Sequence, residues 1–125
     1  MASYLQKVLQ QIDNIVPTKC QGSPYLYTEP KYGAKQQFAE YDTSAPVGND
    51  KQNYVQKVTG KFNWYARGVN ATMLTPISAL LAQQAKPTQA TMRRVQHFLD
   101  YAASKEPAVT TYHASDMVLA IHSDT

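Results

Sequence analysis

The sequence predicts a mainly α-helical chain of three to four amphipathic helices, with a long irregular connector and a short C-terminal β-hairpin. Four stretches have apolar residues at steps of three and four, the spacing of one helical face. They are residues 2–16, 50–69, 73–86 and 88–104. Residues 17–49 hold four of the seven prolines and follow no such period, which predicts a connector. Near the C-terminus the period changes to two, as in β-strands.

Size and composition allow one domain with a modest core, since the chain has 125 residues of which 43% are apolar. No apolar run approaches the roughly 20 residues that span a bilayer, and Lys7 interrupts any segment resembling a signal peptide. The lone Cys20 fits a reducing compartment. We therefore expect no membrane partner and an intracellular location, cytoplasmic or nuclear. The net charge of +3 is compatible with nucleic-acid contact, but many proteins without such a partner share it.

Residues 50–69 are expected to form the helix on which the others pack. Its predicted buried face contains Tyr54, Val55, Val58, Phe62, Tyr65, Ala66 and Val69. The same stretch carries the only tryptophan, Trp64. Because aromatic side chains bury about 150–250 Å² each, this helix should dominate the core. Asn49 or Asp50 is expected to cap its start, and Gly68 lies near its end.

The first predicted helix, residues 2–16, must dock on that central helix or on another part of a larger protein, because it is short. The connector that follows, residues 17–49, has interleaved tyrosines. Either these rings hold the connector on the surface or the connector is mobile. The tyrosines beside Lys31 and Lys35 could also stack on single-stranded nucleic acid, but a linker held by its aromatic rings is the favoured interpretation.

The third predicted helix ends near Lys86, with Asn70 or Thr72 as its cap. Pro76 is tolerated there only if the helix starts at Thr75, which gives the proline the first helical position. Thr88 is expected to cap the fourth helix.

Three basic side chains of that fourth helix, Arg93, Arg94 and His97, fall on its more exposed side. They could contact phosphate, although a solvated basic face is the more common explanation for such a group. The histidines lack a cysteine or carboxylate framework at metal-ligand spacing, and no phosphate-binding glycine loop occurs.

Asp124 ends the second strand of the hairpin predicted for residues 108–125. A carboxylate there can hold a divalent cation, because hard ions prefer oxygen ligands. A two-metal site, however, needs several oxygen ligands around the ions. From spacing alone, an ordinary strand-ending aspartate is therefore favoured.

The order of several segments resembles one known family. Residues 54–102, YVQKVTGKFNWYARGVNATMLTPISALLAQQAKPTQATMRRVQHFLDYA, are followed by residues 112–125, YHASDMVLAIHSDT. Together they resemble the Pol polyprotein of copia-type LTR retrotransposons, in the region that joins reverse transcriptase to ribonuclease H. The family's aromatic pair with Ala-Arg, its small-and-aliphatic helix, its Pro-Thr turn, its F/Y-L-x-Y helix end and its S-D-A strand match residues 58–67, 73–86, 86–88, 98–101 and 121–124. Residues 3–25 also look like the family's thumb helix and the linker after it.

The resemblance implies that Asp124 takes the place of the first acidic metal ligand of ribonuclease H, which shares two Mg²⁺ ions with acidic residues on later elements. Those later residues and the palm with its Tyr-x-Asp-Asp signature are not in this chain, and Thr125 stands where the family has alanine. The parent enzyme would be an RNA-directed DNA polymerase and ribonuclease H that uses Mg²⁺. This chain alone is expected to be inactive and to need no cofactor.

The resemblance divides the chain into a thumb-like helix (1–16), a connector (17–49), a helical connection bundle (50–105) and the first strands of a truncated, α/β ribonuclease H-like domain (108–125). The preferred hypothesis is a polyprotein fragment that grips the template–primer without a complete active site. Its partners would be an RNA–DNA hybrid or template–primer duplex, the missing palm and the rest of the ribonuclease H domain. The alternative is a freestanding helical interaction module that binds protein or nucleic acid.

Overall fold

The computed structural model describes residues 2–14, 16–29, 32–33 and 41–105, and the single residues 108, 109, 111, 113, 114 and 118. These residues form four α-helices and a short 3₁₀ turn, which confirms the mainly helical class. No strand forms among them. The hairpin predicted for residues 108–125 falls mainly outside the described residues and stays a prediction.

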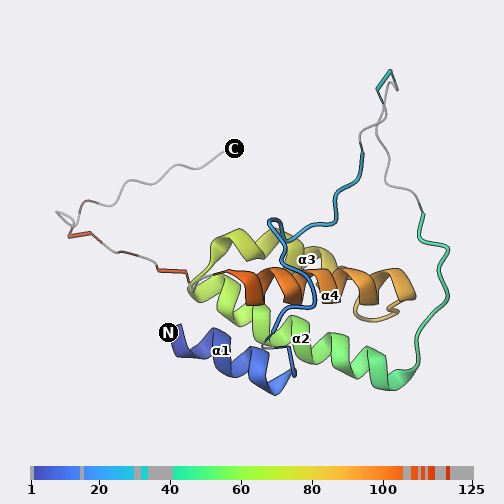
Figure 1. The fold of residues 1–125 in the computed structure, drawn as a ribbon, viewed down its shortest axis with the longest axis horizontal. Coiled ribbons are helices and arrows are strands. Elements are labelled where there is room, and N and C mark those ends of the chain that lie inside the picture. The colour runs from blue at the N-terminus through green and yellow to red at the C-terminus, as the bar shows by residue number, and fades with distance from the viewer. Residues whose placement is uncertain are drawn as a thin grey trace.

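Helix α2 (Asn49–Gly68) lies at the centre, and helices α3 (Leu74–Gln83) and α4 (Gln89–Ser104) pack against it (Figure 1). The predicted face of α2 is the buried one, with Val55, Val58, Phe62, Tyr65 and Ala66 in the core. The ring of Phe62 meets that of Phe98 edge to face, with centroids 5.0 Å apart. Such contacts between aromatic rings add to the burial of apolar surface, so this pair joins α2 to α4.

Helix α1 (Ala2–Gln11) is shorter than predicted. The prediction of a helix to residue 16 was wrong because the chain turns at Asp13, whose φ is +61°. The amide of Asn14 donates to the carbonyl of Leu9 at 2.9 Å and that of Asp13 to Gln10 at 3.1 Å. This pattern closes a helix through a left-handed residue, a position that usually takes glycine or asparagine. The apolar stripe Leu5, Val8, Leu9 and Ile12 joins the same core as α2 and α4.

Two predicted helix starts were also wrong. The N-cap of α2 is Gly48, which makes no side-chain cap bond, so Asn49 and Asp50 lie inside the first turn. Helix α3 starts at Leu74, after a 3₁₀ turn (η1, Ala71–Met73) capped by Asn70, which makes Pro76 its third residue. The proline is tolerated there because the first four amides of a helix have no partner within it. Helix α3 also stops at Gln83 rather than near residue 86.

Trp64 does not contribute to the core as its size suggested, since 52% of its surface is exposed. Its ring packs on Tyr4 of α1, with centroids 4.7 Å apart. The ring of Tyr4 also lies 6.0 Å from that of Tyr65. The aromatic side chains therefore link α1 to α2 at the surface, while one large indole ring remains half accessible.

The described part of the connector is held mainly by polar contacts. Tyr27 is 85% exposed, whereas the amide of Thr18 donates to the buried carboxylate of Asp100 at 3.1 Å. The amide of Gln21 donates to the hydroxyl of Ser104 at 3.3 Å. Residues 16–29 thus run across α4 toward α3 (Figure 1). Tyr25, which is half buried and lines a cavity with Pro76, matches the predicted role of the aromatic rings, whereas Tyr27 does not.

Gly60 lies in the middle of α2 on its solvent-exposed side, where an added Cβ would meet nothing within 4 Å. Because glycine costs about 1 kcal/mol relative to alanine in a helix, Gly60→Ala is expected to raise the free energy of unfolding by about that amount. Urea denaturation followed by circular dichroism measures it. Gly22→Ala, in the connector, is the control and should have a small effect. A lower stability for Gly60→Ala would contradict the open environment assigned to this position.

Candidate nucleic-acid interface

The basic side chains of α4 are placed by how that helix begins. Thr88 caps it with a reciprocal box, in which the Thr91 amide donates to the Thr88 hydroxyl and the Thr88 amide to the Thr91 hydroxyl. Val95, Phe98, Leu99 and Ala102 then form the buried face. The predicted cap is confirmed, and this buried face leaves Arg93 and Arg94 exposed.

Arg93 and Arg94 are both exposed, and neither forms an ion pair within the described part of the chain. Arg94 is close enough to Asp42 to contribute to lowering the pKa of that carboxyl, but the two make no direct contact. Each guanidinium group can bind a phosphate in a bidentate manner. Because adjacent helical residues do not face each other, the two arginines present two separate phosphate-binding groups on the exposed side of α4.

His97 is engaged differently from the two arginines. Its Nε2 lies 2.8 Å from the carbonyl oxygen of Ser23, and the side chain is partly buried. This bond adds a third polar contact between the connector and α4. Contact of His97 with nucleic acid stays a prediction.

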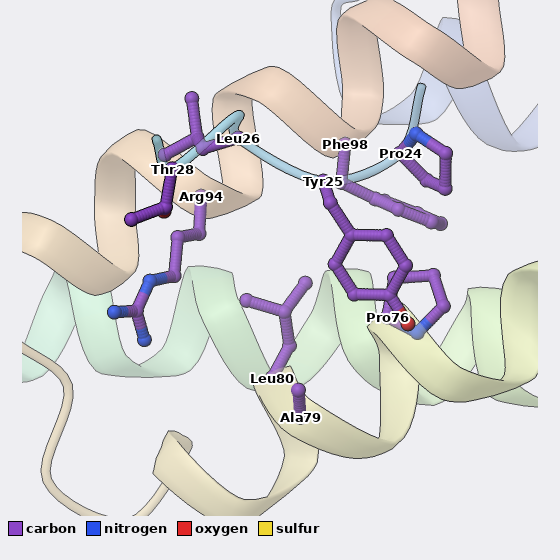
Figure 2. Close-up of a pocket in the computed structure, with 9 residues that line it drawn as sticks. All are labelled: Pro24, Tyr25, Leu26, Thr28, Pro76, Ala79, Leu80, Arg94 and Phe98. Atoms are coloured by element: carbon purple, nitrogen blue, oxygen red, sulfur yellow. The ribbon is translucent and has the colours of Figure 1, made fainter. Parts of the chain in front are cut away.

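A cavity of about 260 Å³ opens beside Arg94, between the connector, α3 and α4 (Figure 2). Its apolar wall comes from Pro76, Leu80 and Phe98. Figure 2 shows Tyr25 over Pro76 at one end and Arg94 at the other. Such a space can accept an apolar group whose acidic end faces the guanidinium.

The far end of the connector returns to the start of α4. The Gln89 amide donates to Ala45 O at 3.0 Å, and the Val47 amide donates to Pro87 O at 3.1 Å. The carboxylate of Asp42 accepts hydrogen bonds from Ser44 and from the Thr88 hydroxyl. These bonds, first that from the Ser44 side chain, lower the pKa of Asp42 to about 2. The start of α4 is therefore stabilised by a carboxylate far away in sequence.

The stability of the protein should depend on Asp42 in acid. A carboxyl whose pKa falls from 3.8 unfolded to about 2 folded stabilises the fold above pH 4, and this contribution disappears between about pH 4 and 2. Thermal unfolding at a series of pH values should show wild type more stable than Asp42→Asn at pH 6, with the difference shrinking over that window. A difference in melting temperature that stays constant from pH 6 to 2 would contradict the assignment.

Asp124, the predicted metal ligand and catalytic residue, lies outside the described residues, so its place in a site stays a prediction. Among the described residues, no three His, Cys, Asp or Glu side chains gather where a metal could bind. Cys20 is exposed as a free thiol.

The roles of Asp42 and Asp100 and the wall that Tyr25 gives the cavity were not predicted from the sequence. Each acts on a partner at least about 45 residues away, so no local period signals it. Asp100 carried one usable signal, a charge within the predicted apolar half of α4.

The chain matches no protein-family model, no curated protein and no solved structure. Within the described residues, none of the helices combines the length and apolar character that crossing a bilayer requires.

Proposed function

We propose that the chain is a template–primer-gripping segment of a retroelement Pol polyprotein, from the region between the reverse transcriptase thumb and ribonuclease H, without a complete active site. The sequence resemblance motivates this proposal. The observation that carries it is the pair Arg93 and Arg94, exposed and without an ion-pair partner in the described residues. The setting would be intracellular, cytoplasmic or nuclear.

The proposed grip is electrostatic. A duplex carries one charge per roughly 1.7 Å of axis, and cations that neutralise phosphates release counterions. Helix α4 is fixed at its start by Thr88 and Asp42 and along its length by the Phe62–Phe98 contact, so its arginines need little ordering upon binding. The grip would act on the backbone and be independent of base sequence.

In this proposal, Mg²⁺ is bound by the parent enzyme and not by this chain alone. Asp124 would supply one carboxylate ligand there, and further acidic residues of the polyprotein would complete the two-metal site. The ions would activate water against the RNA strand. For this chain alone we propose no catalysis and no bound cofactor.

Binding of a labelled RNA–DNA hybrid at low salt tests the proposal. Arg93→Ala with Arg94→Ala should weaken binding at least about tenfold, because two phosphate contacts are lost. Lys51→Ala with Arg67→Ala removes the same charge from exposed positions of α2 and serves as the matched control. Arg93→Lys with Arg94→Lys should retain most of the affinity. Equal losses for the α4 pair and the α2 pair would contradict a specific grip.

The alternative function, a helical module that binds protein, is favoured by the apolar cavity beside Tyr25 and Leu26. Both side chains are about half exposed, so a partner could bury them. Hybrid binding that is absent even at low salt would leave this alternative as the better proposal.

A further inference from the structure

A second basic surface lies where α1 meets α2, and it shares no residue with the α4 arginines. We define the α1–α2 seam as Tyr4, Lys7, Lys57, Lys61 and Trp64. Lys57, Lys61 and Trp64 are spaced by four and three residues, so they share one stripe of α2. Tyr4 and Lys7 are three apart on α1 and share a face in the same way.

The two α2 lysines converge on one neutral residue. Lys57 Nζ donates to the backbone carbonyl of Gln11 at 3.3 Å, and Lys61 Nζ donates to the side-chain Oε1 of the same glutamine. Neither lysine pairs with a carboxylate anywhere in the described chain. Like charges four residues apart on a helix repel each other. The fold therefore holds two ammonium groups together without an anion between them.

A half-exposed indole ring stands next to these charges. Trp64 is one turn from Lys61, so their Cβ atoms lie about 5–6 Å apart. Tyr4 packs on the indole ring with a tilt of 49° between the ring planes, and its hydroxyl lies 3.4 Å from the carbonyl of Lys61. This support from α1 keeps the indole in one orientation while leaving about half of it open to solvent.

We propose that the α1–α2 seam binds single-stranded nucleic acid, with one unpaired base stacked on Trp64 and the adjoining phosphates held by Lys57, Lys61 and Lys7. The chemistry of the surface selects this ligand. Two cations that converge favour an anion such as a phosphate, and the aromatic ring beside them adds a stacking surface for a base. Within a duplex the bases stack on each other, so an indole at the surface gains such a contact only from an unpaired base.

This inference does not rest on the proposed function, because the seam shares no residue with the α4 arginines. The two also differ in ligand, since the α4 site is proposed for a duplex backbone and the seam for an unpaired strand. Each can therefore fail without the other.

The only tryptophan of the chain provides the readout. Titration of the full chain with a thymidine oligonucleotide should quench Trp64 fluorescence and the quenching should weaken with salt. Lys57→Ala with Lys61→Ala should raise the Kd at least about tenfold, whereas the matched pair Lys51→Ala with Lys86→Ala, at exposed positions away from Trp64 in the sequence, should change it less than about threefold.

Gln11→Glu separates binding from folding. It places a carboxylate between the two ammonium groups, so the variant should stay folded, with an unchanged or higher melting temperature, and bind the oligonucleotide more weakly. Unchanged oligonucleotide affinity in Gln11→Glu, or equal affinity in the Lys57/Lys61 variant and its control, would overturn the proposal. Polyglutamate that quenches Trp64 and displaces the oligonucleotide at equal concentration would also overturn it, in favour of an acidic protein.

Discussion

Phe62→Ala is expected to lower the free energy of unfolding by about 3–5 kcal/mol, the range for removing a buried aromatic ring. Phe62 is 0% exposed at the centre of α2, and its ring is the edge-to-face partner of Phe98. The substitution leaves a cavity where α2 and α4 meet, and neighbouring helices can close it only in part. Since small domains are stable by about 5–15 kcal/mol, this one change would remove much of the total.

Urea denaturation followed by circular dichroism measures the loss. Phe62→Leu is the control, because it keeps most of the volume and should cost clearly less. Trp64→Ala, two positions away on the half-exposed side of the same helix, should also cost less. A loss under about 1 kcal/mol for Phe62→Ala would contradict its place in the core.

Asp100→Ala is expected to cost about 2 kcal/mol and to release the connector. The Asp100 side chain is 4% exposed, and its Oδ1 accepts from the Thr18 amide at 3.1 Å and from Gln96 Nε2 at 3.0 Å. Hydrogen bonds to a charged acceptor are each worth more than neutral ones, and truncation leaves both donors without this partner.

Hydrogen exchange resolves the local effect of Asp100→Ala. The amide of Thr18 and its neighbours in residues 16–29 should exchange faster, while the amides of α2 keep their protection. Asp100→Asn keeps an acceptor oxygen and should show a smaller effect. Connector amides that exchange as in wild type would show that Asp100 does not hold this segment.

The helices were predictable where they carry their own signal. The apolar spacing of α2 predicted that Val55, Val58 and Phe62 are core residues, and Thr88 predicted the start of α4. Both signals are local, because a helix places residues three and four apart on one face and needs a cap for its free amides.

Apart from the early end of α1, the missed features depend on partners far away in the chain. The early end of α1 follows from a left-handed Asp13, which nothing in its neighbours required. Trp64 is half exposed and packs on the ring of Tyr4, a residue of α1 about 60 positions earlier in the chain. The connector is held by Asp100, a charge buried on the core side of α4. Of the candidate site, the arginines were predictable from helical spacing, but the cavity beside them was not.

The salt dependence of hybrid binding tests the proposed grip most directly, because its slope counts the phosphates that are neutralised. If Arg93 and Arg94 each contact one phosphate, the double alanine variant should lower the slope of log K against log salt by about 2 relative to wild type. The Lys51/Arg67 control should keep the wild-type slope. Identical slopes for wild type and the Arg93/Arg94 variant would contradict the account, since phosphate contacts by these two side chains would then be absent.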